Sequence, residues 1–287
     1  MTLNDWFKKA LREGWAVPHL NISSLEQLKA MVNVALRLSS PLHIGTSSGE
    51  AKYLGMRQCV ALIRSFREDT GLPIFLNSDH FGNVEEAKRA VDAGYDSIHI
   101  DLSREPFELN IKGTKEVVEY AKSKNKEISV EGELGYLRGS SKVQKEVIQI
   151  NPEDMTDPEQ AVKFVKETKI DRLAPVVGNL HGIAANEPNL DIARVANIRV
   201  SLPDFVSLVL HGGSGIPDEQ IREAVKAGIN NIHVNTEIRV VYADALRKFV
   251  TENPEETTPY KILPPVIEAM EKKIEEKIKL FGSVNRI

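Results

Sequence analysis

The stretch EEAKRAVDAGYDSIHID, residues 85–101, contains the pattern on which the fold prediction rests. A helical segment ends at Gly94, a residue type that adopts positive φ at no steric cost, and an apolar strand begins a few residues later. The stretch EQIREAVKAGINNIHVN, residues 219–235, repeats this order with its glycine at Gly228. The two copies start 134 residues apart, about half the chain, which suits strands four and eight of a barrel.

The same alternation of strand and helix extends over the whole chain. Eight segments are predicted strands: 15–22, 42–47, 73–78, 97–102, 128–134, 172–178, 206–211 and 231–236. Each precedes a helical pattern, at about 24–39, 55–70, 83–94, 106–124, 157–168, 190–199, 217–228 and 238–252. Eight such units in fewer than 300 residues are typical of a parallel α/β fold closed into a (β/α)8 TIM barrel.

The two ends of the chain lie outside this repeat. A short amphipathic helix is expected at about 3–14, before the first strand. After Asn253 the chain contains four prolines and then a charged helix at about 266–280. We expect residues 254–287 to form a helical extension packed on the barrel or on a neighbouring subunit. Because no low-complexity linker divides the chain, residues 1–287 are predicted to form a single domain.

Composition excludes several classes of protein. The 287 residues contain 37 Lys and Arg against 41 Asp and Glu, a net charge of −4, so no bulk basic field is available for nucleic acid or an anionic membrane. No apolar run is long enough for a transmembrane helix, and the first residues lack the pattern of a signal peptide. The single cysteine, Cys59, fits a reducing cytoplasm. We therefore expect a cytoplasmic enzyme or binding protein.

Polar residues collect at the ends of the predicted strands, whose interiors are expected to be apolar. In a barrel all strands open their carboxyl ends on one face, where active sites form. Side chains from distant parts of the sequence are therefore expected to converge on one pocket. They are Asn21, Ser47, Ser48, Asp79, His80, Asp101, Glu133, His181, His211, Asn235 and Thr236.

Three of the seven histidines are candidate metal ligands. His80, His181 and His211 each follow a predicted strand, and three neutral imidazoles with an open fourth position suit a zinc site. A structural role for each remains the alternative. His19, His43 and His99 are expected to be core or supporting groups, and His233 lies nearer the mouth of the barrel.

A glycine-rich turn and one carboxylate are the other candidates. The run HGGSGIP, residues 211–217, places backbone amides and Ser214 before a helix N-terminus, which favours phosphate binding; a plain tight turn is the alternative. Asp79 beside His80 is a candidate acid/base, or else a carboxylate that orients a histidine ligand.

Five segments together resemble the class II, zinc-dependent fructose- and tagatose-bisphosphate aldolases, over essentially the whole chain. The segments are SDH (78–80), IDLS (100–103), VEGELG (130–135), GNLHG (178–182) and LHGGSGIP (210–217). The resemblance implies Zn²⁺, or another divalent metal, on His80, His181 and His211, with Asp101 and Glu133 near an alternative metal position. A monovalent cation is a further candidate.

The resemblance also implies a reaction and its groups. Asp79 would exchange a proton with the C4 hydroxyl, while the metal polarises the ketose carbonyl. The dihydroxyacetone phosphate half would be held by residues of three loops. These are Gly182, Gly212, Gly213, Ser214, His233, Val234, Asn235 and Thr236. Asn21 and Ser47 are further candidates for substrate binding, and a dimer or tetramer is expected.

The chain departs from the pattern at three places. His233 stands where the family has an asparagine, and the loop after Gly135 lacks its usual carboxylate unless Glu146 substitutes. The segment Pro259-Tyr260-Lys261 stands where an arginine often follows the proline. We predict a metal-dependent aldol lyase acting on a phosphorylated ketose similar to fructose 1,6-bisphosphate, with His233 as a second catalytic group. The alternatives are a divergent metal-dependent lyase or isomerase on another phosphosugar, and a non-catalytic phosphosugar-binding protein.

Overall fold

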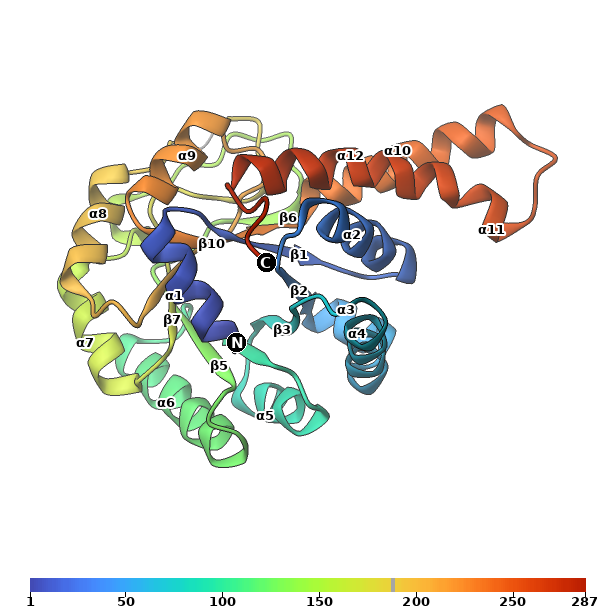
Figure 1. Cartoon of the computed structure of the whole chain (residues 1–287). Coiled ribbons are helices and arrows are strands. Elements are labelled where there is room, and N and C mark those ends of the chain that lie inside the picture. The colour runs from blue at the N-terminus through green and yellow to red at the C-terminus, as the bar shows by residue number, and fades with distance from the viewer. Residues whose placement is uncertain (187–188) are drawn as a thin grey trace.

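A closed eight-stranded parallel barrel forms the centre of the molecule (Figure 1). The computed structural model describes residues 1–186 and 189–287. The strands follow the order β1-β10-β9-β7-β5-β4-β3-β2. They are β1 (Val17–Asn21), β2 (Leu42–Ser47), β3 (Ile74–Phe81), β4 (Ser97–Ile100), β5 (Ser129–Leu134), β7 (Arg172–Pro175), β9 (Ser207–Leu210) and β10 (Ile229–Val234). The predicted (β/α)8 barrel is confirmed.

Eight helices surround the barrel and bury an apolar face against it. They are α2 (Leu25–Leu38), α4 (Met56–Thr70), α5 (Val84–Ala93), α6 (Phe107–Lys124), α7 (Pro158–Thr168), α8 (Ile192–Ser201), α9 (Asp218–Lys226) and α10 (Thr236–Glu252). Local chemistry sets their limits: Ser24 caps α2 by accepting from the Gln27 amide, and α5 stops at Gly94, whose φ is 100°. One continuous apolar core lies between helices and strands.

The first helix, α1 (Leu3–Glu13), packs against β1, β9 and β10 at the amino-terminal end of the barrel (Figure 1). Its buried Leu3, Trp6 and Phe7 form a second apolar cluster with Trp15. The Asn230 side chain donates to the Phe7 carbonyl and ties α1 to β10. The helix expected at 3–14 therefore closes the end of the barrel opposite to the predicted site.

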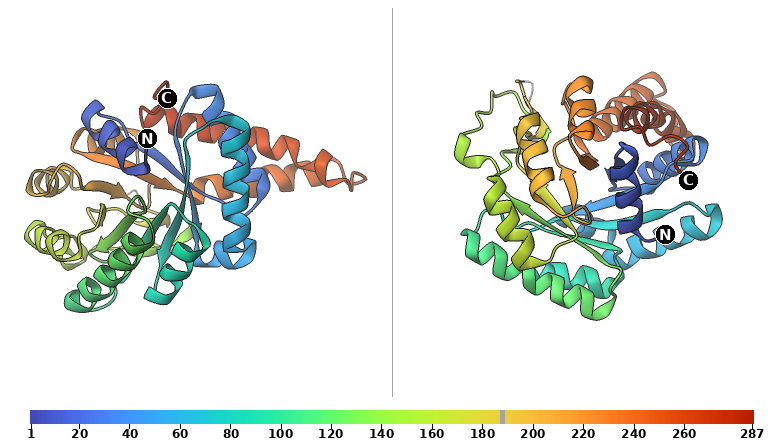
Figure 2. Two further views of the ribbon diagram at one scale, coloured as in Figure 1. Left: turned by 60° about the horizontal axis from the view of Figure 1, so that its bottom comes forward. Right: turned by 60° about the vertical axis from the view of Figure 1, so that its left-hand side comes forward.

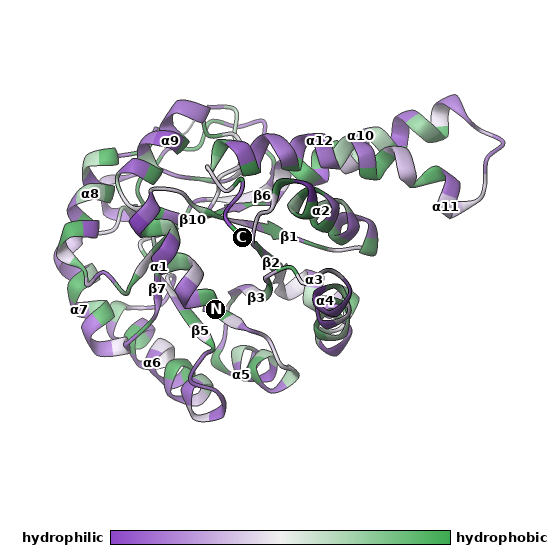
Figure 3. Ribbon diagram, viewed as in Figure 1, coloured by the Kyte–Doolittle hydropathy of each residue, from purple (hydrophilic) through white to green (hydrophobic). Residues whose placement is uncertain are grey.

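The last helices form an arm that extends beyond the barrel (Figures 1 and 2). In it α10 packs against α12 (Pro264–Leu280), and the short α11 (Pro259–Ile262) lies near the tip. The tip is mostly hydrophilic (Figure 3) but exposes Tyr260, 76% accessible. No helix among the described residues combines the length and apolarity needed to cross a membrane.

Some elements differ from the prediction. The strand expected at 73–78 continues to Phe81, with its pairing to β4 shifting between Ser78 and Phe81. Two short strands were missed, β6 (Gly139–Val143) and β8 (His181–Ile183), which pair beside the barrel mouth. The residues of β6 are all exposed, so no apolar alternation marks them in the sequence. The helix expected from 55 is preceded by α3 (Ser48–Leu54), with Gly55 between them.

The expectation of apolar strand interiors is wrong for one face of the barrel. Alternate residues of each strand point inward, and many of these are polar and buried. They are His19, Asn21, His43, Asn77, Asp79, Ser97, His99, Ser129, Glu131, Glu133, Arg172, His211, Asn231 and His233. Barrel interiors are more commonly filled by branched apolar side chains. The apolar strand residues that the sequence shows belong instead to the layer facing the helices.

Candidate active site

A small pocket opens at the carboxyl ends of the barrel strands, where the sequence places the site. It is lined by Asn21, Asp79, His80, Ser141, His181, Gly182, His211, Gly212, Ser214, His233, Asn235 and Thr236. All of these except Ser141 were candidates from the sequence. Residues from six strands and their loops thus meet at one point, because parallel strands end on one face.

Six predicted residues do not line the pocket; one of them, Ser48, donates instead to Glu86 of α5. Asp101 and Glu133 lie behind His80, with carboxylate oxygens 3.0 and 3.3 Å from its Nδ1. Ser47 caps α3 by accepting from the Glu50 amide, and the Gly213 amide donates to the His233 carbonyl. Val234 is buried in the apolar core. Ser47 and Val234 thus take part in packing and capping in this structure.

Two histidines point their ring nitrogens at each other across the pocket. The Nε2 atoms of His80 and His181 lie 3.0 Å apart. Because the Asp101 carboxylate can only accept, His80 Nδ1 carries a proton, and in the neutral imidazole the lone pair then lies on Nε2. Burial would raise the pKa of Asp101, but contact with His80 lowers it well below its usual range. Two imidazole nitrogens that converge in this way suit a cation.

The third histidine, His211, is fixed from below by a carboxylate. Its Nε2 donates to Glu131 Oε1 at 2.6 Å, which leaves Nδ1 with the lone pair. Its ring centre lies 4.4 Å from that of His80. A histidine whose second nitrogen is held by a carboxylate is the usual arrangement of a metal ligand.

Asp79 lies between two partners in the pocket. Its Oδ2 accepts from the Asn21 amide at 2.8 Å, and its Oδ1 lies 3.2 Å from His233 Nδ1. The Asn231 amide donates to the Val17 carbonyl, so its oxygen faces His233 Nε2 at 3.2 Å and fixes a proton there. Asp79 Oδ1 and His233 Nδ1 lie at hydrogen-bond distance, so a proton bound by one group is shared with the other. The two groups therefore act as a coupled pair.

The glycines of the predicted phosphate loops are required by close backbone packing. Gly182 and Gly212 have φ of 82° and 66°, and a Cβ would lie 2.2 Å from the Ser140 carbonyl oxygen and 2.0 Å from that of Leu180. The Ser214 hydroxyl accepts from the Glu237 amide in the first turn of α10. The pocket therefore opens on the N-terminus of a 17-residue helix, which favours an anion.

The remaining histidines are buried below the pocket. His19 stacks on His233 with ring centres 3.4 Å apart, and His43 bonds Ser97. His99, expected to be a core histidine, is buried but also takes part in the site, because its Nδ1 lies 3.1 Å from the backbone nitrogen of His80, which has a positive φ of 52°.

Four groups were missed by sequence reasoning. Glu131 and Arg172 lie under His211, Glu50 accepts from the side chains of Asn21 and Asn235, and Ser141 comes from β6. The spacing of Glu131 from Glu133 was a usable signal, since residues two apart on a strand share a face. Glu146, considered as a substitute loop carboxylate, is exposed and does not line the pocket.

Among the described residues, four sets of His, Asp and Glu could hold a metal ion. Three involve predicted ligands: His80 with Asp101 and Glu133, His80 with Asp79, His99 and His211, and His211 with Glu131 and His233. The first set matches the alternative metal position. His181 belongs to none of these sets, although its Nε2 is 3.0 Å from that of His80.

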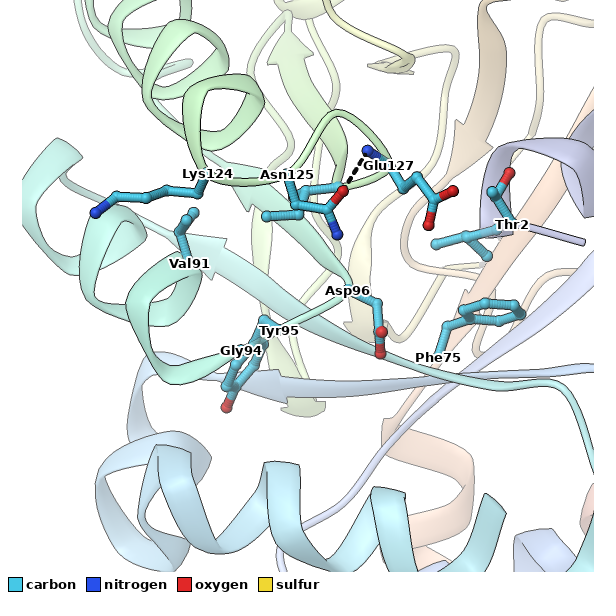
Figure 4. A pocket seen from close by; sticks show the side chains of 11 residues that line it. Thr2, Phe75, Val91, Gly94, Tyr95, Asp96, Lys124, Asn125 and Glu127 are labelled. Carbon is cyan, nitrogen blue, oxygen red and sulfur yellow. Dashed lines mark hydrogen bonds between the residues drawn. The ribbon is translucent and has the colours of Figure 1, made fainter. Parts of the chain in front are cut away.

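A second cavity, of about 290 Å³, lies at the amino-terminal end of the barrel beside α1 (Figure 4). It is lined in part by Phe75, Asp96 and Glu127. The Asp96 carboxylate accepts from the Leu76 amide and pairs with Arg67. This end of a barrel contributes to stability rather than to chemistry, so the cavity is not a competing active site.

Comparison with known proteins places the chain in a family. The family model described as "Fructose-bisphosphate aldolase class-II" matches residues 1–286. The fructose-bisphosphate aldolase of Geobacillus stearothermophilus is 36% identical over 99% of this chain and 97% of its own. That of Staphylococcus aureus (strain Mu50 / ATCC 700699) is 35% identical, covering 100% and 98%. The crystal structure of the YdjI aldolase from Escherichia coli K12 superposes with a TM-score of 0.83 at 30% identity, covering 99% and 98%.

These matches agree with the geometry. The family is metal-dependent, and the described residues include the histidine and carboxylate groups that a metal requires. The two alternatives, another phosphosugar reaction and a non-catalytic binding protein, are not favoured. The chain belongs to the class II fructose-bisphosphate aldolase family and is an aldolase, a carbon–carbon lyase acting on a phosphorylated ketose.

Proposed function

We propose that the protein is a zinc-dependent aldolase that reversibly cleaves a ketose similar to fructose 1,6-bisphosphate into dihydroxyacetone phosphate and an aldehyde. The observation that carries the proposal is the arrangement of His80 and His181, whose Nε2 atoms lie 3.0 Å apart next to Asp79. Both relatives are named fructose-bisphosphate aldolases, which supports the same substrate class.

Zn²⁺ would be held by His80 and His181 through Nε2 and by His211 through Nδ1. The fit rests on the hydrogen bonds of His80 to Asp101 and of His211 to Glu131, which leave the opposite nitrogen of each ring unprotonated. Asp101 and Glu133 would serve the alternative position behind His80. A bound divalent cation supplies Lewis-acid polarisation of the ketose carbonyl.

Asp79 would take the proton from the C4 hydroxyl during cleavage and return it during condensation. The proton shared between Asp79 Oδ1 and His233 Nδ1 makes His233 the second member of this acid/base pair. Asn21 holds the other carboxylate oxygen and so orients Asp79 toward the pocket. This pairing accounts for a histidine at a position where the family has an asparagine.

The phosphate of the dihydroxyacetone half would bind at the N-terminus of α10. Gly182, Gly212, Ser214, Asn235 and Thr236 would form this side of the site, with Gly213 behind them. The helix dipole and the backbone amides supply the positive potential that the net charge of −4 does not.

The test is a screen of ketose mono- and bisphosphates for release of triose phosphate, together with metal analysis of the purified protein. We expect about one divalent metal ion per chain, cleavage that a chelator abolishes, and restoration of cleavage by Zn²⁺. Asp79→Asn should lower kcat by about 10²–10⁴-fold and retain the metal, whereas exposed Asp92→Asn should change neither. The absence of both metal and cleavage would refute the proposal.

We also propose that the protein forms a homo-oligomer through the arm of α10 and α12. The arm extends from the barrel (Figure 2) and exposes Val250 and Tyr260, at 49% and 76%. Sedimentation velocity should show a dimer or tetramer, and Tyr260→Glu should shift it toward smaller species. A monomer at micromolar concentration would contradict this part.

A further inference from the structure

The fully buried Arg172 links several groups below the active site. It is the first residue of β7, and its Nη1 forms an ion pair with Glu131 Oε2 at 2.5 Å. Its Nε donates to Ser129 Oγ at 3.1 Å, and its Nη2 donates to Asn77 Oδ1 at 3.1 Å. The Phe7 ring of α1 lies 5.4 Å from the guanidinium and shields it from the end of the barrel. The Arg172 side chain has no accessible surface, so no solvent reaches this charge.

One branch of the network leads from Arg172 to a predicted metal ligand. Glu131 uses one oxygen for Arg172 and the other for His211 Nε2. Because the guanidinium can only donate, its ion pair with Glu131 requires an acceptor on that side of the carboxylate. The other oxygen accepts from His211 Nε2, which directs the Nδ1 lone pair of His211 to the pocket.

A second branch leads to the proposed acid/base pair. Arg172 Nη1 lies 3.4 Å from Asn231 Oδ1, the same oxygen that accepts from His233 Nε2. The guanidinium has only donors, so it favours the orientation of Asn231 in which the oxygen faces His233. His233 Nδ1 is then the nitrogen that faces Asp79.

A contribution to stability does not explain this arrangement. Replacing a buried ion pair by apolar side chains of similar volume is often neutral or stabilising, and barrels ordinarily fill these positions with such side chains. The two branches have a common effect, which is to set which nitrogen of each histidine carries the proton.

We infer that Arg172 is a positioning residue that fixes the tautomers of His211 and His233 through Glu131 and Asn231. It thereby presents His211 Nδ1 to the metal and His233 Nδ1 to Asp79. The inference deepens the proposed function and rests on it for the identity of the ligand, Zn²⁺.

The sharpest test is Glu131→Gln, with zinc affinity measured by competition against a chromophoric chelator. The Arg172 guanidinium has only donors and still needs an acceptor. The oxygen of the introduced side-chain amide therefore faces Arg172, and its nitrogen faces His211 Nε2. The amide nitrogen can only donate, so His211 Nε2 must accept, and the imidazole proton moves to Nδ1, where it blocks metal binding. We expect zinc affinity to fall by about 10–100-fold, the size of effect typical of groups that orient metal ligands.

The double variant Glu131→Gln/Arg172→Met tests the role of Arg172 itself. Without the guanidinium, the introduced amide can rotate and offer its oxygen to His211, so zinc affinity should recover most of the loss. Arg199→Met is the matched control, since this arginine is largely buried but donates only to the carbonyls of Leu202, Pro203 and Val206. It should leave zinc affinity unchanged. A double variant that binds zinc as weakly as Glu131→Gln would overturn the inference.

A measurement on the unmodified protein keeps the inference testable if a variant fails to fold. Two-bond ¹H–¹⁵N correlation spectra of histidine-labelled, metal-free protein distinguish the tautomers. His211 should be protonated at Nε2, and protonation at Nδ1 would refute the inference. Because this readout needs neither metal nor substrate, it is independent of the cleavage assay. The absence of ketose cleavage would refute the proposed function and leave the tautomer assignment standing.

Discussion

The two faces of each barrel strand differ sharply in chemistry. Toward the helices, residues such as Ile98 and Ile100 join one continuous apolar core. Toward the barrel axis, their neighbour His99 lies among histidines, carboxylates and the guanidinium of Arg172. The outer layer is held by burial of apolar surface, which is non-directional, whereas the inner layer depends on hydrogen bonds with defined donors and acceptors.

This difference separates stability from function within one sheet. An apolar layer tolerates replacement of one hydrocarbon by another of similar volume. A buried polar layer costs desolvation free energy, but its hydrogen bonds hold each side chain in one orientation. We conclude that the outer layer accounts for most of the stability and that the inner layer holds the active site. Substitutions in one layer or the other can therefore test the contrast.

The largest effect on stability is expected from Arg172→Met. Removing the guanidinium leaves Glu131 as an uncompensated buried carboxylate, which typically costs about 3–5 kcal/mol. Adding Glu131→Met removes the stranded charge and should restore most of the free energy of unfolding. Urea denaturation of both variants provides the measurement. If the double variant is no more stable than the single one, the polar interior contributes to stability directly and the contrast fails.

Much of the fold follows from the sequence because the outer layer has a periodic signature. Helices and apolar strands alternate, and glycines such as Gly94 and Gly228 stop the helices where the strands are due. Eight strands and their helices were predicted within a few residues. The strand β6 was missed because its residues are all exposed, and β8 because it has only three residues. The strand β3 was predicted too short because Asp79 and His80, near its end, are polar.

The candidate site was predictable for a different reason. Parallel strands bring their carboxyl ends together, so polar strand-end residues such as Asp79 and His211 could be assigned to one pocket without any contact information. Arg172 could not, because it begins its strand and reads as a polar boundary residue. Its partners Glu131 and Asn231 are 41 and 59 residues away along the chain, and no local pattern links such distant positions.

The second largest loss of stability is expected from a substitution in the outer layer alone. Ile98→Ala removes a fully buried side chain between strand and helix and should lower the free energy of unfolding by about 2–5 kcal/mol. Because Ile98 faces away from the barrel axis, kcat per folded molecule and zinc affinity should not change. Steady-state kinetics and chelator competition at a temperature where the variant is folded provide the check. A change in zinc affinity would show that the two layers are coupled.

A smaller effect is expected where one glycine makes room for the inner layer. A Cβ on Gly45 of β2 would lie 2.2 Å from His19 Cε1 and 3.2 Å from Asn21 Cγ. Gly45→Ala should therefore displace the His19 ring from its stack on His233, at a cost of about 1–3 kcal/mol as for other overpacked interiors. Activity should fall with it, unlike in Ile98→Ala. Retention of full kcat would show that the stack is dispensable.

The last prediction uses protons to distinguish members of the inner layer. Burial lowers the pKa of His19 to about 3, although the carboxylates of Asp79 and Glu131 act to raise it. An unfolded histidine titrates near 6.5, so between these values the unfolded chain binds one proton more than the native protein. The contribution of His19 to stability is then fully present above pH 6.5 and falls by about 1.4 kcal/mol for each pH unit below it. His19→Gln should reduce the acid slope of the metal-free protein by this amount, as urea titrations in that window would reveal.

His99 provides the matched control, because its pKa is shifted in the opposite direction. Burial would lower the pKa of His99, but Glu131, Asp79 and Glu133 outweigh burial and raise it well above 6.5. Its stabilising contribution is therefore complete below pH 6.5 and is lost only as the pH rises through the folded-state pKa. His99→Gln should leave the acid slope intact. If His19→Gln and His99→Gln changed the acid slope equally, the two histidines would not have pKa values shifted in opposite directions. The different partners assigned to each ring would then be wrong.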